Sequence, residues 1–274
     1  MKSVAGKTVL VTGAAMGLGK LFARTAVQEQ AAAVVLWDVN EGALTETAAE
    51  LTADGGTVRT YVVDVASGPA VTRAATRVRK DVGAVQVLVN NAGIVRGNGY
   101  FWENDKRDIE KTMLVNSIAP MRLAREFLPA MVASDEECRI VNLASSAGLN
   151  AVPRLAVYCG SKWAAIGWSD SVRLELEQAG HKHVRVTTVC PTYINTGMFD
   201  GAKGIFLTPM LEQEGVVAGT WRAMLEGKPI LLIPWTSRLN KVVSNILPLR
   251  ARDAFLRRTG VYDSMAEFTG HAAT

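Results

Sequence analysis

The chain alternates short, continuous apolar runs with stretches in which apolar residues recur at helical spacing. Runs such as Thr8-Val-Leu-Val-Thr12 have the character of strands buried on both faces of a parallel sheet. The expected strands cover residues 7–12, 33–38, 58–63, 85–89, 139–143, 184–189 and 229–233. The expected helices cover residues 18–30, 41–53, 70–82, 105–133, 158–178 and 214–226. This alternation predicts a Rossmann-type α/β fold, a doubly wound parallel sheet of about seven strands with helices on both faces.

The same pattern predicts the domain organisation. Residues 1–234 carry the alternating strands and helices, and no repeat, low-complexity tract or linker divides them. A chain of 274 residues is long enough to bury one large core. We therefore expect a single domain, with residues 235–274 as a C-terminal extension that packs on the same domain or on a neighbouring subunit.

A glycine-rich loop connects the first expected strand to the first expected helix. Its sequence is Thr12-Gly-Ala-Ala-Met-Gly-Leu-Gly19. Glycines let the backbone turn sharply and approach a pyrophosphate, whose charge the helix N-terminus stabilises. The candidate cofactor residues of this loop are Gly13, Met16, Gly17, Leu18 and Gly19.

An acidic residue, Asp38, ends the second expected strand about twenty residues after this loop. There its carboxylate can accept hydrogen bonds from the hydroxyls of an adenosine ribose. No arginine follows it, and Met16 rather than a basic residue lies inside the glycine loop. A 2′-phosphate would meet a carboxylate with no cation to offset the repulsion, so the sequence favours NAD over NADP.

Candidate acid/base chemistry lies at the start of the fifth expected helix. Tyr158 and Lys162 are at positions i and i+4 and share one helix face. A nearby ammonium favours phenolate and can adjust a phenol whose free pKa is about 10. Asn116 lies within the apolar helical run, where it predicts a local kink, a satisfied core amide or a bound water, and Pro120 just beyond it supports a local distortion.

Taken in order, these motifs resemble those of the short-chain dehydrogenase/reductase family. The markers are Thr12-Gly-x-x-x-Gly-x-Gly19, Asp38, Asp64-Val65, Asn90-Asn-Ala-Gly93, Asn116, Ser145, Tyr158-x-x-x-Lys162 and Pro191…Thr196. The resemblance runs from Lys7 to about Pro234. Several ordered motifs at family spacing are far more specific than any one of them.

The resemblance implies a role for each matching residue. Tyr158 would be the general acid/base, and Ser145 would orient the substrate oxygen. Lys162 would lower the Tyr158 pKa and bind the nicotinamide ribose, while Asn116 would hold a water in a proton relay. The further cofactor residues implied are Asp64 and Val65 at the adenine, Asn91, Ala92 and Gly93 at the ribose, and Pro191, Ile194 and Thr196 at the carboxamide. One departure is Thr192, where the family usually has glycine.

Within the family, the chain resembles the retinol and hydroxysteroid dehydrogenases through Cys-Pro-Thr-Tyr-Ile-Asn-Thr-Gly-Met-Phe199 and an extended tail. The implied function is NAD-dependent interconversion of a lipophilic secondary alcohol and its ketone. The alcohol would be of the long-chain hydroxy fatty acid, sterol or retinoid type. Proton transfer would use Tyr158, and hydride would pass to NAD. Alternatives are a carbonyl or 3-oxoacyl reductase of the same family, or a non-catalytic NAD-binding sensor, which would not need all four catalytic residues.

The resemblance also implies a homodimer or homotetramer, in which helices 105–133 and 158–178 pair about a two-fold axis. Members of this branch often carry an N-terminal membrane anchor, and none is recognised here. No run approaches the roughly 18 apolar residues of a membrane span, so a cytoplasmic location is expected. The three cysteines imply no disulfide framework and fit a reducing compartment. No metal site is expected, since His181, His183 and His271 form no ligand set.

Net charge of +4 is concentrated in the extension, where residues 235–260 hold six basic side chains and one aspartate. A nucleic-acid-binding protein would more often spread its basic groups along a face with exposed aromatics, so no nucleic-acid partner is expected. An apolar stripe at helical spacing is formed by Leu239, Val242, Val243, Ile246 and Leu247. The stripe is expected either to pack on a subunit or to border the substrate cleft with Ile205, Phe206, Leu207 and Met210. In the second case its basic rim would attract an anionic lipid surface or a substrate carboxylate.

Overall fold

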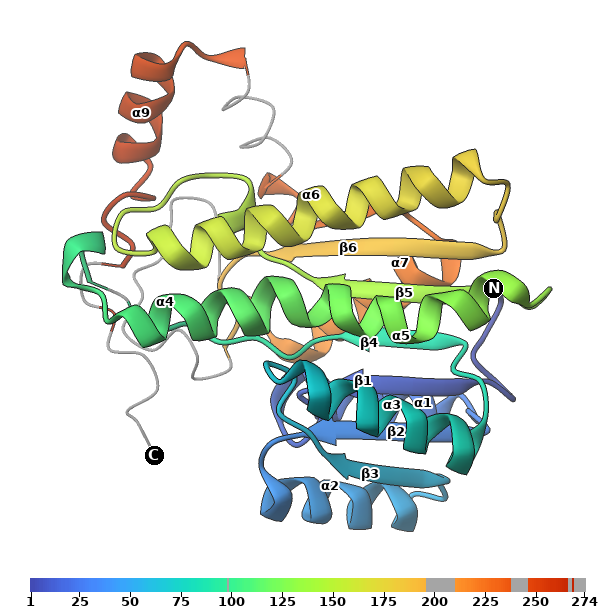
Figure 1. Cartoon of the computed structure of the whole chain (residues 1–274). Helices are drawn as coiled ribbons and strands as arrows, with labels where there is room; N and C mark the ends of the chain where they lie inside the picture. Colours follow the sequence, from blue (N-terminus) through green and yellow to red (C-terminus); the bar gives the residue numbers. More distant parts are fainter. Residues whose placement is uncertain (98, 196–209, 238–245, 266–267, 269–274) are drawn as a thin grey trace.

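A seven-stranded parallel sheet forms the centre of the protein (Figure 1). The computed structural model describes residues 1–97, 99–195, 210–237, 246–265 and 268. The strands are β1 (Thr8–Thr12), β2 (Ala33–Asp38), β3 (Val58–Val62), β4 (Val87–Asn90), β5 (Cys138–Leu143), β6 (Val184–Pro191) and β7 (Ile230–Ile233). Their order across the sheet is β3-β2-β1-β4-β5-β6-β7. The predicted doubly wound sheet is confirmed, because the strand order reverses between β1 and β4.

The central strands are apolar on both faces because helices cover both sides of the sheet. Every residue of β1 and β4 is buried. Leu10 of β1 lies opposite Val35 of β2 on one side and Leu88 of β4 on the other. The edge strand β3 instead exposes most of its side chains. The hydrophobic pattern therefore fixes which strands lie at the centre.

Two apolar clusters separate the helices into layers. One face carries α1 (Gly17–Gln28), α2 (Glu41–Ala53) and α7 (Gln213–Glu226), whose Phe22, Leu44 and Met224 join one cluster. The other face carries α3 (Gly68–Val82), α5 (Ala119–Ala133) and α6 (Ala156–Gln178), whose Val71, Leu123 and Leu176 join the second. In Figure 1, α5 and α6 lie in front of the sheet, and α1 and α7 lie behind it.

The helix predicted over residues 105–133 is divided into three parts. It consists of α4 (Lys106–Met113), a π-helical turn (Leu114–Ile118) and α5. The π-turn contains Asn116, which is 2% exposed and whose side chain bonds the backbone of Ile94. The predicted distortion is confirmed at this residue. The predicted helical stretch is confirmed as well, and the π-turn within it holds one residue more than an α-helical turn.

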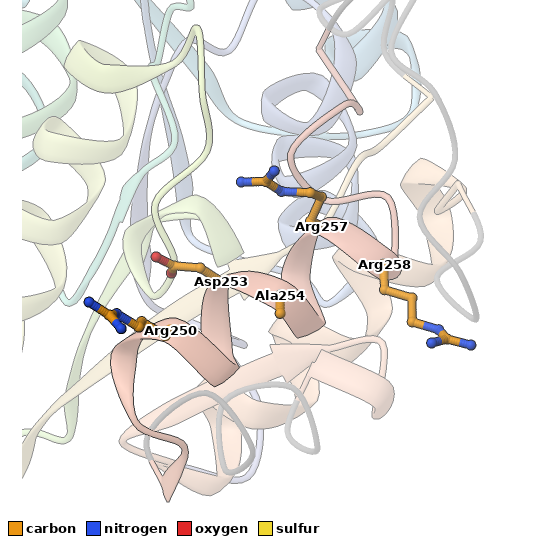
Figure 2. A pocket seen from close by; sticks show the side chains of 5 residues that line it. All are labelled: Arg250, Asp253, Ala254, Arg257 and Arg258. Carbon is orange, nitrogen blue, oxygen red and sulfur yellow. The ribbon is translucent and has the colours of Figure 1, made fainter.

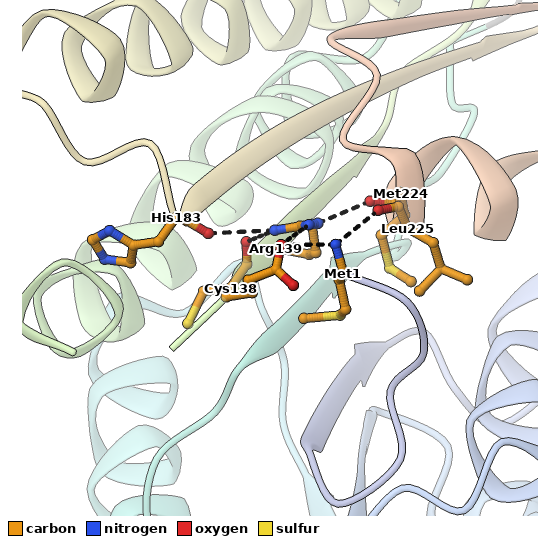
Figure 3. A network of polar contacts seen from close by, with 7 residues as sticks. Met1, Cys138, Arg139, His183, Met224 and Leu225 are labelled. Atoms are coloured by element: carbon orange, nitrogen blue, oxygen red, sulfur yellow. Dashed lines mark hydrogen bonds and ion pairs between the residues drawn. The ribbon is translucent and has the colours of Figure 1, made fainter. Parts of the chain in front are cut away.

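A network centred on Arg139 lies at the opposite end of the sheet from the carboxyl ends of the strands (Figure 3). The guanidinium is 3% exposed and donates to the carbonyls of Met224 and Cys138 and to the carboxylate of Glu137. The N-terminal ammonium donates to the same carboxylate at 2.7 Å. These two donors hold the pKa of Glu137 below its usual range. The network ties the start of β5 to α7 and to Met1.

The C-terminal extension contains a helix that the sequence did not predict, α9 (Leu249–Arg258). It buries Leu256, which is 2% exposed. Most of the predicted apolar stripe lies outside the described residues, namely Leu239, Val242 and Val243, and so do Ile205, Phe206 and Leu207 of the proposed cleft border. Ile246 and Met210 are described and are 76% and 45% exposed. Among the residues that the structure places, no helix has the length and apolar character needed to cross a bilayer.

Candidate active site

The glycine loop after β1 forms a cradle at the N-terminus of α1. Gly13 and Gly17 have positive φ angles of +64° and +55°, a backbone region that other residues rarely adopt. At Gly19, which has an ordinary φ, a Cβ would overlap the carbonyl oxygen of Gly13. The loop therefore needs glycine at all three positions, twice for conformation and once for space.

Two side chains support this loop, Asn91 directly after β4 and Thr12 at the end of β1. Asn91 donates its two amide hydrogens to the carbonyls of Thr12 and Gly13, at 2.9 and 3.1 Å. The Thr12 hydroxyl oxygen accepts from the backbone N–H groups of Asn91 and Ala92, both at 3.1 Å. Asn91 thus uses its side chain to shape the loop, and Thr12 is a supporting residue that the sequence analysis did not single out.

Asp38 lies at the carboxyl end of β2, beside the glycine loop. Its carboxylate accepts from the backbone N–H of Ala15 and of Asn40, both at 3.0 Å. Each oxygen keeps a lone pair, so the carboxylate can still accept from a ligand. Met16 is 57% exposed and lies at the N-cap of α1, without a cation beside it in the loop sequence.

The next pair, Asp64 and Val65, follows β3. Val65 is buried, while the Asp64 carboxylate pairs with the Lys111 ammonium of α4 at 2.7 Å and accepts from the Ala66 N–H at 2.9 Å. Burial acts to raise the pKa of Asp64, but the two donors outweigh it and hold the pKa below its usual range. Asp64 therefore stays ionised and fixes the last turn of α4 against the loop after β3.

Tyr158, Ser145 and Lys162 meet at the carboxyl ends of β5 and β6. Ser145 is 7% exposed and follows β5, where its hydroxyl accepts from the Ala147 N–H at 3.2 Å and hydrogen-bonds Tyr158. Lys162 lies one turn after Tyr158, with its ammonium 5.6 Å from the centre of the phenol ring. The ammonium donates to the carbonyl of Leu143, the last residue of β5, at 2.8 Å. The two side chains therefore lie on the same face of α6, as their i, i+4 spacing predicts.

The protonation states of this pair follow from burial. Tyr158 is 5% exposed, and burial raises its pKa, although the hydrogen bond from Ser145 acts to lower it. Burial also lowers the pKa of Lys162 to about 8. The lowering of the Tyr158 pKa by Lys162 stays a prediction, since burial of the phenol dominates its pKa in the chain alone.

Asn116 connects the π-turn to α6 and to the loop after β4. Its Oδ1 accepts from the Ile94 N–H, and its Nδ2 donates to the Ile94 carbonyl and to the Ser161 hydroxyl at 3.1 Å. A Cβ on Gly93 would lie 3.5 Å from both Asn116 Oδ1 and Lys162 Nζ. Asn116 and Lys162 therefore flank the same glycine. Ser161 was missed in the sequence, where a serine inside an apolar helix carries no signal of its own.

The segment after β6 completes this edge of the sheet. Pro191 ends β6, and Ile194 is 6% exposed and forms a single parallel bridge to Leu211. Thr192 donates its N–H to the Ile233 carbonyl at 3.0 Å and has no positive φ, so the backbone accommodates threonine where the family usually has glycine. Thr196, the other predicted carboxamide residue, lies outside the described residues.

The cradle fits the pyrophosphate of a dinucleotide. The N-terminus of α1 has no side-chain cap and no acidic residue in its first turn. Three other helices, α2, α3 and α4, are capped by the side chains of Asn40, Ser67 and Asp105, whereas α6 and α9 also lack a side-chain cap. The free N–H groups and positive end of α1 suit a doubly charged anion held against glycines.

Comparison with known proteins agrees with this geometry. The family model described as short chain dehydrogenase matches residues 7–203. Estradiol 17-beta-dehydrogenase 11 of Rattus norvegicus is 37% identical over 260 residues, covering 95% of this chain and 86% of the relative. Epidermal retinol dehydrogenase 2 of Homo sapiens is 37% identical over 270 residues, covering 97% and 86%.

Solved structures give the same result. A short-chain dehydrogenase/reductase from Burkholderia phymatum in complex with NAD has a TM-score of 0.82 at 28% identity, covering 94% of this chain and 97% of the other. A metagenomic short-chain oxidoreductase in complex with NADP has a TM-score of 0.70 at 30% identity, covering 84% and 96%. The chain therefore belongs to the short-chain dehydrogenase/reductase family of oxidoreductases, in the branch of the retinol and hydroxysteroid dehydrogenases.

Proposed function

We propose that the protein interconverts lipophilic secondary alcohols and their ketones with NAD. The observation that carries this proposal is the meeting of Tyr158, Ser145 and Lys162 beside an apolar cluster that includes Leu155, Cys159 and Val152. The hydroxyl groups supply a place for an alcohol or carbonyl oxygen. The apolar surroundings favour a substrate with little polarity around the reacting carbon.

The chain's own residues perform the proton transfer and orientation. In oxidation, Tyr158 in its phenolate form takes the hydroxyl proton of the alcohol, while Ser145 donates a hydrogen bond to the substrate oxygen. Lys162, fixed by the Leu143 carbonyl, places a positive charge beside the phenol. When bound, NAD supplies the hydride-accepting chemistry. The glycine loop would hold its pyrophosphate, Asp38 an adenosine ribose hydroxyl and Lys162 the nicotinamide ribose.

Carbonyl reduction is the second candidate, and one observation favours it. Because burial raises the pKa of Tyr158, the phenol is protonated at neutral pH in the chain alone. A protonated phenol is a general acid, the form that donates a proton to a ketone oxygen as it is reduced. The same side chains serve alcohol oxidation and ketone reduction. The two candidate functions therefore differ in their substrate and not in their catalytic residues.

A substrate panel tests the proposed function. Steroid, retinoid, hydroxy fatty acid and short secondary alcohols would each be supplied with NAD, and NADH absorbance would be followed. The matching ketones would be supplied with NADH. We expect turnover with at least one bulky lipophilic member in either direction. Turnover confined to short polar alcohols would contradict the proposed substrate class, and no turnover with any member would contradict the function.

Cofactor choice gives a separate prediction at Asp38. We expect kcat/KM for NAD to exceed that for NADP by at least about tenfold, because a 2′-phosphate would lie against this carboxylate. Asp38→Ala should bring the two kcat/KM values closer together. The value for NADP should rise because the repulsion of the 2′-phosphate is removed, and the value for NAD should fall because a hydrogen bond to the ribose is lost. Glu41→Ala, which removes a carboxylate three residues later at the start of α2, is the matched control. Equal wild-type values for the two cofactors would refute the prediction.

We also propose a homo-oligomer in which α4, α5 and α6 pair with those of a second copy. On α6, Trp163 and Leu174 are each 51% exposed, and burying them against a second copy would be favourable. Both would be covered by a two-fold pairing of these helices. This argument for an oligomer does not involve the C-terminal extension, whose exposed face is basic.

The exposed face of α9 suits an anionic lipid surface, as a peripheral contact of a cytoplasmic protein. The helix carries four arginines against one aspartate. Arg250, Asp253, Ala254, Arg257 and Arg258 line a concave surface of about 460 Å³ (Figure 2). Arg252 pairs with Asp253 at 3.2 Å, which leaves the other three arginines to carry the positive charge. At the start of the helix Leu249 is 62% exposed, so apolar and basic groups are presented together.

Vesicle binding tests this contact. Replacing Arg250, Arg257 and Arg258 together by glutamine should weaken binding to phosphatidylserine-containing vesicles about a hundredfold, since each basic group near such a surface contributes about 1 kcal/mol. Raising the salt concentration should weaken wild-type binding in the same way.

The matched control replaces three exposed basic residues of α3, Arg73, Arg77 and Lys80, and should leave vesicle binding unchanged. Equal loss in both triple variants would mean that net charge alone matters. If the wild type sediments as a larger assembly that the α9 variant cannot form, the face binds a second copy instead of lipid.

A further inference from the structure

The turn that follows α9 enters the apolar cluster of the catalytic tyrosine. Met265 is 1% exposed and Phe268 is 9% exposed. Both belong to one buried cluster with Ala147, Leu155, Tyr158 and Cys159. Ala147 follows the catalytic serine by two residues, and Leu155 precedes Tyr158 by three. Two side chains from the end of the chain thus lie in the group of residues that surrounds the proposed reacting position.

A hydrogen-bond chain fixes this turn to the loop after β6. Tyr193 and Ser264 are 2.8 Å apart through their hydroxyls, and Ser264 donates to the Val261 carbonyl at 2.7 Å. Because Ser264 has a single proton and gives it to Val261, Tyr193 is the donor to Ser264. Ser264 is fully buried. Tyr193 is itself packed against the cluster, one residue before Ile194 of the predicted cofactor segment.

The placement of these groups is specific. Within the part of the chain that the structure describes, the extension adds no strand to the sheet, and α9 buries Leu256 outside this cluster. A tail that served only to cover the core could end on any apolar surface. Here it presents a methionine, which adapts to irregular shapes, and a phenylalanine, which offers a flat apolar ring. Both pack in the cluster that contains Tyr158, beside the position proposed for the reacting alcohol.

We infer that Met265 and Phe268 form the wall of the substrate pocket that selects bulky lipophilic alcohols, and that the Tyr193–Ser264 hydrogen bond positions this wall. The inference rests on the proposed alcohol dehydrogenase function. Met265 and Phe268 determine which substrate fits against Tyr158. Tyr193 and Ser264 act through them and are positioning residues.

Met265→Ala in the full-length protein tests the wall. We expect kcat/KM for a steroid secondary alcohol to fall at least about tenfold, while that for 2-propanol changes little, because lost apolar contact affects only the substrate that reaches it. The matched control is Met131→Ala in α5. This methionine is also 1% exposed, but it lies in the cluster between the sheet and the helices α3, α5 and α6. The control should lower thermal stability to a similar extent without changing the ratio of the two kcat/KM values.

Tyr193→Phe tests the positioning of the wall. We expect it to raise KM for the steroid several-fold and to leave kcat nearly unchanged, since the wall becomes less ordered but the acid/base residues remain. Ser264→Thr keeps a hydroxyl and should retain most of the wild-type KM. Ser264→Ala should resemble Tyr193→Phe.

Three outcomes would overturn the inference. If Met265→Ala and Met131→Ala change both substrates alike, Met265 only supports the fold. If Met265→Ala increases turnover of both alcohols, the tail covers Tyr158 as a lid and does not form a wall. If the wild type oxidises no alcohol, the proposed function is wrong. The wall can then still be tested by measuring the binding of the steroid ketone by calorimetry. Equal affinity of wild type and Met265→Ala for that ketone would overturn it.

Discussion

Tyr158→Phe is expected to lower turnover by about 10² to 10⁴-fold while leaving NAD binding intact. The substitution removes only the hydroxyl that exchanges a proton with the substrate, and the ring keeps its place in the apolar cluster. Turnover would be followed as NADH absorbance and NAD binding by calorimetry. The matched control is Tyr61→Phe in β3, where the hydroxyl donates to Asp81 at 2.8 Å, far from the catalytic edge. Turnover near the wild-type value in Tyr158→Phe would remove Tyr158 from the acid/base role.

The pH dependence of the wild type follows from the same residue. Burial raises the pKa of Tyr158, so at neutral pH the phenolate needed for alcohol oxidation is the minor form. Oxidation should therefore accelerate as pH increases above neutrality, by up to about tenfold per pH unit, while ketone reduction should not. Tyr158→Phe should lose this dependence. A flat wild-type profile for oxidation would mean that bound cofactor or substrate restores a low pKa.

Arg139→Met is expected to destabilise the protein by about 3 kcal/mol without changing cofactor affinity. The side chain is 3% exposed, and its loss removes a donor from the buried carbonyls of Cys138 and Met224, of which Met224 keeps the Gly227 N–H. The Glu137 carboxylate would keep only the N-terminal ammonium. The free energy of unfolding would be measured with urea and NAD affinity by calorimetry.

Arg173→Met on α6 is the matched control for this prediction. Arg173 also makes two ion pairs, with Asp170 and Glu177, but its own side chain is 21% exposed, against 3% for Arg139. Pairs of that kind contribute about 0 to 1 kcal/mol. If both variants lose the same free energy of unfolding, or if Arg139→Met loses none, then the Arg139 network contributes no more to stability than an exposed ion pair.

The strands and the order of the catalytic motifs could be predicted from the sequence because each depends on local pattern. Buried parallel strands need continuous apolar runs, and the glycine loop needs residues that tolerate positive φ, as Gly13 and Gly17 do. The i, i+4 relation of Tyr158 and Lys162 follows from helix geometry alone. The prediction of a distortion at Asn116 succeeded for a similar reason, since a polar residue and a proline interrupt one apolar run.

What could not be predicted depends on contacts between distant segments. The extra residue in the π-turn is fixed by Asn116 bonding Ile94 and Ser161, neither of which is near it in sequence. The raised pKa of Tyr158 reflects burial, which the spacing to Lys162 does not reveal. The sequence of the tail shows one apolar stripe, which ends at Leu247, and it does not predict α9 because the many arginines there obscure the single buried position at Leu256.

The junction between Tyr193 and Ser264 has a consequence for how such a protein can diverge. The turn that it fixes supplies no strand, so substitutions there alter no register between neighbouring strands. Cofactor chemistry is encoded early in the chain and in the sheet edge, whereas pocket shape is encoded in a few residues near its end. A lineage could therefore change its substrate through the tail while the redox machinery stays constant. Random mutagenesis confined to this turn would sample new specificities without altering the register of the sheet, while changes at its buried positions, such as Met265, would lower stability.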